Sequence, residues 1–218
     1  MKHLERRQQL IATAIELNTS GINQGTSGNV SVRVDEGLLI TPSGMTYPSL
    51  TPEDIVLMDL EGQASSPRSP RFPSSEWRFH VDIYQQRNDV QAIVHTHSVY
   101  ATALACLEKS IPAFHYMVAM AGGKDIRCAP YATYGTQTLS DLALVALKDR
   151  KACLLAHHGV IATGSDLSRA FALASEVETL SQQYIAALSV GEPTILSDKE
   201  MEIVVDKFSN YGLNVSQY

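Results

Sequence analysis

The sequence predicts a layered α/β fold. Helical and strand patterns alternate along its 218 residues, as expected when helices pack on a sheet. Apolar residues make up 44% of the chain and charged residues 18%, a balance typical of globular proteins. The length suits one domain over residues 1–218. The polar tail, about residues 209–218, is of the kind that stays mobile at a chain end.

The strands are predicted from alternating or continuous apolar residues. Val30, Val32 and Val34 alternate with Ser31 and Arg33, which indicates a half-buried strand. The segment after it, residues 38–41, is typical of its hairpin partner. Three further apolar runs predict strands at residues 55–60, 92–96 and 152–157.

The helices are predicted from apolar stripes and from terminal signals. A stripe through Leu10, Ile11, Ala14 and Ile15 predicts a helix over residues 3–17. Similar patterns predict helices at residues 75–86, 99–107, 139–147, 167–188 and 198–208. A Thr-Pro-Glu-Asp sequence at 51–54 predicts a short helical start, and the Ser- and Pro-rich segment 63–73 predicts an exposed loop.

Charge and cysteine content exclude several classes of protein. The net charge of −6 argues against a general nucleic-acid binder, and no apolar run is long enough to span a membrane. Cys106, Cys128 and Cys153 are too few and too scattered for a disulfide framework, which favours a reducing, cytoplasmic location. Because the whole molecule is negatively charged, an anionic substrate must be held by local groups at its binding site.

Two predicted strands end in histidines. His95 and His97 are two residues apart at the end of an apolar run, so both side chains lie on one face. His157 and His158 follow a second such run. Neighbouring strand residues face opposite ways, so one of this pair is expected at a shared site, and spacing does not decide which. Zinc enzymes commonly use three protein ligands, so a three-histidine site is favoured over solvated strand ends.

Small-residue segments supply candidate anion sites. Ser74 and Ser75 precede the helix predicted from residue 75, where free N–H groups favour an anion or where serine simply caps the helix. Glu76 and His80 share a helix face, so either can approach a metal, or His80 can pack. Loops at residues 25–29 and 41–44 let the backbone approach a ligand, although each alone is more typical of a turn.

Taken in order, these segments resemble the class II aldolase/adducin family. The stretches that carry the resemblance are 21–33 (GINQGTSGNVSVR), 40–44 (ITPSG), 73–80 (PSSEWRFH), 95–97 (HTH), 111–117 (IPAFHYM), 129–136 (APYATYGT) and 157–159 (HHG). They cover nearly the whole chain. The likeness is strongest to bacterial members that act on L-fuculose 1-phosphate. It implies a three-layer α/β/α fold with a central mixed, largely antiparallel sheet.

The resemblance also assigns roles to residues. It implies one Zn²⁺ per subunit held by His95, His97 and His158, with Glu76 as fourth ligand and catalytic base. It implies Tyr116 of a neighbouring subunit as the acid, within a homotetramer whose site lies between subunits. The substrate phosphate would bind Gly28, Asn29, Ser43, Gly44, Ser74 and Ser75, and the aldehyde pocket would include Tyr134 and Tyr211. Membrane and nucleic acid are not expected as partners.

The implied reaction is reversible cleavage of L-fuculose 1-phosphate, or a similar ketose 1-phosphate, to dihydroxyacetone phosphate and L-lactaldehyde. An L-ribulose-5-phosphate 4-epimerase shares the metal ligands and is the nearest alternative, together with other class II sugar-phosphate aldolases. A metal-dependent hydrolase and a non-catalytic adducin-like interaction domain are the alternatives of other classes. A Schiff-base aldolase is disfavoured because the clustered motifs contain no lysine.

Overall fold

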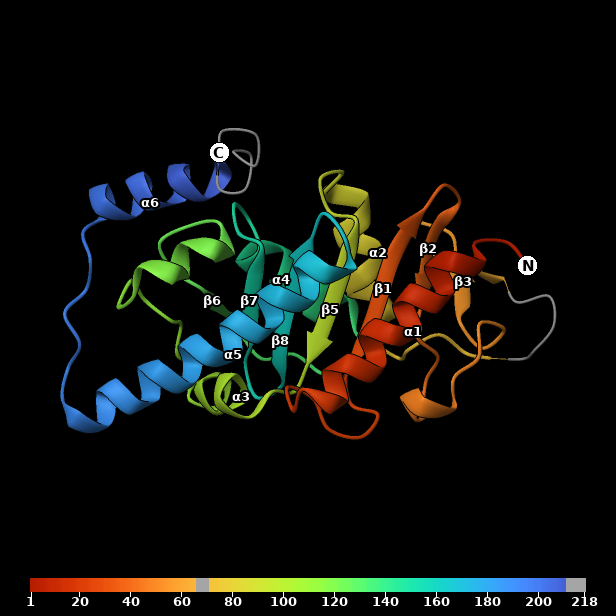
Figure 1. The fold of residues 1–218 in the computed structure, drawn as a ribbon, viewed down its shortest axis with the longest axis horizontal. Helices are drawn as coiled ribbons and strands as arrows, with labels where there is room; N and C mark the ends of the chain where they lie inside the picture. The colour runs from red at the N-terminus through yellow and green to blue at the C-terminus, as the bar shows by residue number, and fades with distance from the viewer. Residues whose placement is uncertain (66–70, 211–218) are drawn as a thin grey trace, which may run out of the picture.

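A central sheet runs through the molecule (Figure 1). The computed structural model describes residues 1–65 and 71–210, and within these ranges the sheet has eight strands in the order β4-β3-β2-β1-β5-β8-β7-β6. The strands are β1 (Asn29–Val34), β2 (Gly37–Ile40), β3 (Val56–Met58), β4 (Ala64–Ser65), β5 (Ala92–Thr96), β6 (Arg127–Ala129), β7 (Ala152–Leu155) and β8 (Gly159–Gly164). Neighbours are antiparallel except β6 and β7, which are parallel. The predicted mixed, largely antiparallel sheet is confirmed.

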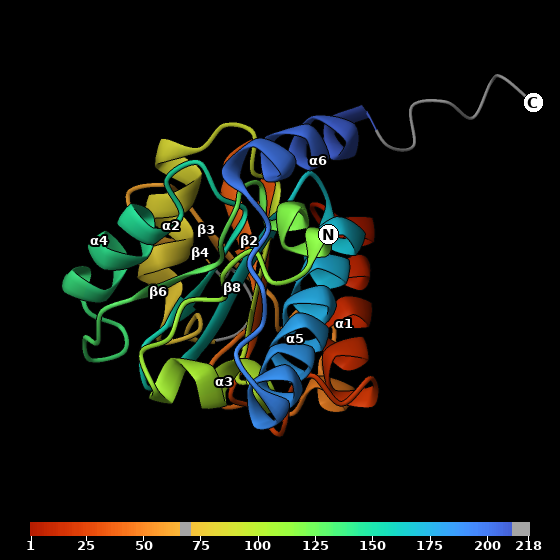
Figure 2. The same cartoon turned by 90° about the vertical axis from the view of Figure 1, so that its left-hand side faces the viewer.

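Helices cover both faces of this sheet, which completes the three predicted layers (Figure 2). One face carries α1 (Leu4–Thr19), α3 (Val99–Cys106) and α5 (Leu167–Val190), and the other carries α2 (Trp77–Gln86) and α4 (Gln137–Ala146). The remaining helices are η1 (Tyr47–Ser49), η2 (Tyr116–Ala121) and α6 (Asp198–Asn210), which packs against η2. In the part of the chain that the structure describes, no helix is long and apolar enough to cross a membrane.

The two faces bury separate apolar cores because successive strand residues point to opposite sides. In β5, Val94 packs with the core under α1 and α5, whereas Ile93 packs with the core under α2 and α4. All five residues of β5 are buried. A continuous apolar run is therefore required at this central position.

Some elements differ from their predictions. Residues 51–54 form a turn rather than a helical start; the Asp54 N–H donates to the Thr51 carbonyl, and the Asp54 carboxylate accepts from the N–H and the hydroxyl of Thr51. The strand predicted over 152–157 ends at Leu155, and a second strand, β8, begins only four residues later. The segment 63–73, predicted as a loop, contains the two-residue strand β4, and its residues 66–70 lie outside the described ranges.

The sheet order brings the chemically important segments together. Asn29, at the start of β1, pairs in register with His95 of β5. On the other side of β5, Thr96 pairs with Val160 of β8. The C-terminal end of β5 is thus flanked by the beginnings of two neighbouring strands, which is where side chains from separate parts of the sequence can converge.

Candidate metal centre

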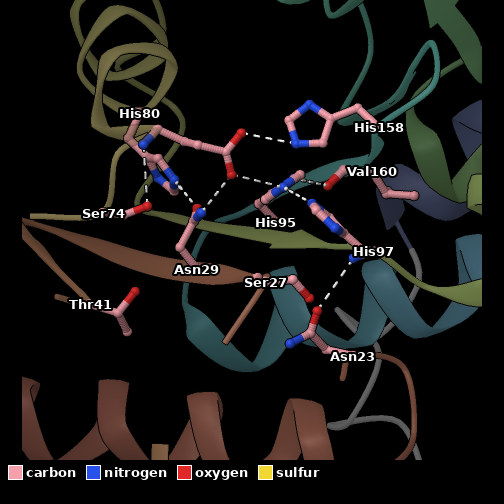
Figure 3. Close-up of polar contacts among 12 residues, drawn as sticks. Asn23, Ser27, Asn29, Thr41, Ser74, His80, His95, His97, His158 and Val160 are labelled. Atoms are coloured by element: carbon pink, nitrogen blue, oxygen red, sulfur yellow. Dashed lines mark hydrogen bonds and ion pairs between the residues drawn. The ribbon is translucent and has the colours of Figure 1, made fainter. Parts of the chain in front are cut away.

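Four of the predicted site residues converge at the end of β5. Glu76, His95, His97 and His158 each present one ligand atom, and these atoms all lie within 4.8 Å of one another. The three imidazole rings approach one another edge to face, with centroids 4.8–4.9 Å apart (Figure 3). His80, which also shares a helix face with Glu76, is not part of this group.

His157 and His158 lie in a turn, not in the strand predicted for them. The tight connection from β7 to β8 is closed by a hydrogen bond from the His158 N–H to the Leu155 carbonyl, and His157 has a left-handed backbone with φ 54°. His158 points into the cluster, whereas the half-exposed His157 ring lies 3.3 Å from the Glu108 carboxylate. As expected, only one of the two histidines reaches the site, but the cause is this turn and not the alternation of side chains along a strand.

The backbone fixes which nitrogen His95 presents. His95 Nδ1 lies 2.8 Å from the Val160 carbonyl oxygen and donates to it. A neutral His95 therefore has its lone pair on Nε2. This Nε2 lies 3.1 Å from Glu76 Oε2 and 3.0 Å from His97 Nε2. These atoms do not form a stable arrangement without a proton or a cation among them.

The charge on Glu76 is stabilised although its side chain is buried. Burial alone would raise the pKa of this carboxyl, but the adjacent His95 and His158 outweigh that effect and hold the pKa well below its usual range. Burial, together with repulsion from His95 and His158, lowers the pKa of His97 to about 4. Glu76 is thus a carboxylate and His97 a neutral imidazole near pH 7, which are the protonation states that bind metals.

These residues fit a divalent metal. The buried Glu76 Oε1 accepts no hydrogen bond among the described residues, although it lies 3.0 Å from His158 Nε2. A cation would satisfy this oxygen and the imidazole lone pairs together. Three imidazoles and one carboxylate form a donor set that suits zinc and other first-row metals.

The three loops predicted to bind phosphate meet beside the cluster. The Thr41 hydroxyl accepts from the Val30 N–H at 3.2 Å, and the Thr41 carbonyl accepts from the Ser74 N–H at 3.0 Å. The Ser43 N–H in turn donates to the Phe72 carbonyl. Gly28, Gly44 and Ser75 are the chain neighbours of Asn29, Ser43 and Ser74 in these loops. Phosphate binding at these loops stays a prediction.

Asn29 and Ser74 already have partners within the protein. Asn29 Nδ2 donates to Glu76 Oε2 at 3.0 Å, and its Oδ1 lies 2.6 Å from His80 Nε2. Ser74 Oγ accepts from the Glu76 N–H at 3.3 Å. Glu76, not a serine, is the residue that precedes the first turn of α2. Both side chains therefore help to fix Glu76.

The tyrosines predicted to act on the aldehyde lie outside these contacts. Tyr116 is half exposed at the start of η2, and its ring stacks on Phe208 of α6 with centroids 6.4 Å apart. Tyr134 is exposed, and the next residue, Gly135, lies against the Ser75 carbonyl. Tyr211 lies outside the described residues.

Two further contacts that orient the histidines had no signal in the sequence. The Val160 carbonyl, which fixes the His95 tautomer, belongs to a strand that the apolar pattern did not separate from its neighbour. Asn23 Oδ1 accepts from the His97 N–H at 3.3 Å, which anchors the backbone of that ligand (Figure 3). Asn23 lies in one of the family-like stretches, but its spacing alone assigns it no role.

We expect Gly28→Ala to destabilise the site through contact with the β5 backbone. A Cβ at position 28 would lie 2.6 Å from the His95 carbonyl oxygen and 2.7 Å from Asn23 Oδ1. Overpacking of this kind costs about 1–3 kcal/mol. Thermal unfolding should show the loss, with weaker metal binding because His95 moves. Gly191→Ala, where the new methyl meets open space, is the control, and equal stability of the two variants would contradict the close approach.

Comparisons with known proteins agree with this geometry. The family model for the class II aldolase and adducin N-terminal domain matches residues 8–185. The chain is 58% identical to a 5-methylthioribulose-1-phosphate/5-deoxyribulose-1-phosphate aldolase of Rhodospirillum rubrum, over 95% of this chain and 93% of that protein. It is 49% identical to an L-fuculose phosphate aldolase of Escherichia coli, over the whole of both chains. A solved structure of an L-fuculose 1-phosphate aldolase superposes with a TM-score of 0.91 at 43% identity, covering 96% of this chain and 97% of that one.

Proposed function

This chain belongs to the class II aldolase and adducin family, and we propose that it cleaves a ketose 1-phosphate between C3 and C4 in a metal-dependent aldol reaction. The observation that carries the proposal is the convergence of Glu76, His95, His97 and His158 beside three small-residue loops. The products are dihydroxyacetone phosphate and an aldehyde made of the remaining carbons.

The residues of the cluster have two tasks in this proposal. A divalent metal, zinc in our proposal, would be held by His95, His97 and His158 with Glu76 as fourth ligand, and would act as a Lewis acid on the substrate carbonyl group. The Glu76 carboxylate moves the proton at C3. In aldol synthesis the carboxylate removes a proton from C3, and in cleavage, the reverse reaction, the protonated Glu76 side chain gives its proton to C3.

Other residues bind the phosphate and manage the second proton. The hydroxyls of Ser43, Ser74 and Ser75 and the backbone N–H groups of Gly28, Gly44 and Ser75 hold the phosphate, with the Asn29 amide beside them, so the overall charge of −6 is not an obstacle. In the direction of synthesis, Tyr116 of a neighbouring subunit donates a proton to the aldehyde oxygen as the C3–C4 bond forms, and cleavage is the reverse of this step. The proposal therefore includes a homo-oligomer, a tetramer by the family resemblance.

Two substrates are supported by different relatives. L-fuculose 1-phosphate, which yields L-lactaldehyde, is supported by the relative that matches over both full lengths. 5-Deoxyribulose 1-phosphate and its 5-methylthio analogue are supported by the relative with the higher identity. These ketose phosphates differ only beyond C3, so the choice depends on the aldehyde pocket, where we place Tyr134 and the tail residue Tyr211.

A coupled assay for dihydroxyacetone phosphate tests the proposal. We expect release of this product from L-fuculose 1-phosphate or 5-deoxyribulose 1-phosphate, with the ratio of the two kcat/KM values identifying the preferred aldehyde. Chelation should stop the release and zinc should restore it. If L-ribulose 5-phosphate is instead converted to its 4-epimer with no triose phosphate released, the protein is an epimerase. Release of inorganic phosphate alone would indicate a hydrolase.

A further inference from the structure

A chain of buried polar side chains runs from the cluster into the core between β1 and α2. His80 and Tyr84 are four residues apart on one face of α2, and Glu76, four residues before His80, immediately precedes this helix. Asn29, Ser31 and Arg33 share one face of β1. Asn29, Ser31, His80 and Tyr84 each expose 2% or less of their surface. The two faces meet and interleave their polar groups where apolar packing would be expected.

Each contact in this chain is a hydrogen bond. Tyr84 OH lies 2.8 Å from Ser31 Oγ, which lies 2.7 Å from His80 Nδ1. His80 Nε2 lies 2.6 Å from Asn29 Oδ1, and Asn29 Nδ2 lies 3.0 Å from Glu76 Oε2 (Figure 3). No polar side-chain atom of Asn29, Ser31, His80 or Tyr84 is among the buried unpaired atoms of the described residues. Such complete pairing is needed because an unpaired polar group at these depths is costly.

Donor and acceptor rules allow only one direction for these bonds. Glu76 is a carboxylate and only accepts, so Asn29 must present its NH₂ group to Glu76 and its carbonyl oxygen to His80. His80 Nε2 must then carry the hydrogen. Burial, followed by repulsion from His95, lowers the pKa of His80 to about 3, so the ring is neutral and Nδ1 accepts from Ser31. Ser31 Oγ in turn accepts from Tyr84.

The far end of the chain is held by the backbone and by a cation. Burial raises the pKa of the Tyr84 phenol, so it remains a donor. The Arg33 guanidinium lies 4.7 Å from the centroid of the Tyr84 ring and donates to the Tyr84 carbonyl at 2.6 Å. The Phe79 ring stacks on His80 with centroids 4.6 Å apart, which restricts the imidazole plane. These contacts hold Tyr84 and His80 in place, so the hydrogen bonds from Tyr84 through Ser31 and His80 to Asn29 keep the direction that the Glu76 carboxylate requires.

We propose that Tyr84, Ser31 and His80 form a one-way hydrogen-bond chain that locks the Asn29 amide, so that His80 is a positioning residue for the Glu76 carboxylate. This inference rests on the proposed role of Glu76 as the base. The chain does not conduct protons, because the Asn29 amide donates from one atom and accepts at another. Its effect is to keep one donor aimed at Glu76 Oε2 while Glu76 gains and loses its proton.

Activity of His80 variants separates positioning from packing. His80→Leu leaves Asn29 Oδ1 without a donor and frees the amide to rotate, whereas a glutamine at this position can still donate from Nε2. We expect kcat of His80→Leu to fall roughly ten- to a hundredfold, since displacements of about 1 Å at a reacting group cost up to about 10²-fold. His80→Gln should recover most of this loss, with metal content unchanged in both variants. Equal kcat values in the two variants, or wild-type kcat in His80→Leu, would overturn the proposal.

A spectroscopic measurement tests the chain without any activity. In metal-loaded wild-type protein, ¹⁵N NMR should show His80 as the tautomer protonated at Nε2. Ser31→Ala removes the donor to Nδ1 while Nε2–H still donates to Asn29 Oδ1, so the Nδ1 resonance should shift towards that of an unbonded lone-pair nitrogen, and Tyr84→Phe should have a smaller effect in the same direction. A wild-type ring protonated at Nδ1, or an Nδ1 resonance unaffected by Ser31→Ala, would refute the proposal. Because this measurement needs no substrate, it remains decisive if no tested ketose phosphate is cleaved.

Discussion

Glu76→Gln is expected to abolish proton transfer while leaving a carbonyl oxygen in place as a ligand. General acid–base groups contribute about 10²–10⁴-fold to rate, and we expect kcat for the cleavage to fall by this factor. The cause is the loss of the group that carries the C3 proton, because an amide can neither deliver that proton in cleavage nor remove it in synthesis. Steady-state kinetics with parallel metal analysis measures the effect. Glu16→Gln, an exposed substitution on α1, is the matched control.

Hydrogen exchange separates this role from that of Tyr116. With dihydroxyacetone phosphate alone in D₂O, the wild-type enzyme should exchange one hydrogen of the hydroxymethyl carbon, since this half-reaction needs the base but no aldehyde. Glu76→Gln should lose this exchange. Tyr116→Phe should retain it and lose only carbon–carbon cleavage. Persistent exchange in Glu76→Gln would show that another group is the base.

The sequence predicted most elements that are long or fully buried. The five residues of β5 and the regular stripe of α5 have patterns that tertiary context does not change. Strands β6 and β8 were not predicted. β6 has only three residues, two of them half-buried at the edge of the sheet, so it lacks an apolar run. Only three residues separate β7 from β8, so the sequence pattern predicted one strand over residues 152–157 and no second strand after it.

The candidate site was predictable where ligands share one element. His95 and His97 are two residues apart, so the strand period alone brings them together. His158 was ambiguous because the left-handed turn at His157 reverses the chain, and a non-glycine residue in that conformation has no reliable sequence signal. The resemblance to known aldolases, not the spacing, selected His158, and the structure places it in the cluster.

The chain of hydrogen bonds behind Glu76 depends on tertiary pairing. The spacing of His80 and Tyr84 on α2, and of Asn29 and Ser31 on β1, is visible in the sequence. The opposition of these two faces is not, because they lie about fifty residues apart and meet through the sheet order. Sequence reasoning left His80 as either a ligand or a packing residue. The structure shows a third arrangement, in which His80 hydrogen-bonds to Asn29, and Asn29 donates to the Glu76 carboxylate.

Exchanging each of the two adjacent histidines for asparagine should separate a metal ligand from its neighbour. His158→Asn removes an imidazole from the cluster. Changes to groups that only support ligands cost about 10–100-fold in metal affinity, so loss of a ligand itself should exceed about a hundredfold. His157→Asn is the control, because asparagine tolerates the left-handed backbone at this position and the His157 ring lies against the exposed residues Glu108 and Tyr131, outside the cluster. Metal titration followed by activity assays measures both.

The same titration at several pH values tests the state of the cluster. The His95 pKa is raised, because the nearby Glu76 carboxylate outweighs the lowering effect of burial, so a proton competes with the metal at this residue. Metal affinity should therefore weaken as pH falls, and binding near neutral pH should release protons. His97, with a pKa of about 4, adds to this competition only in more acidic solution. If His157→Asn rather than His158→Asn loses metal, or if affinity does not change with pH, the four residues are not the ligands, and the aldolase would have to place its metal elsewhere.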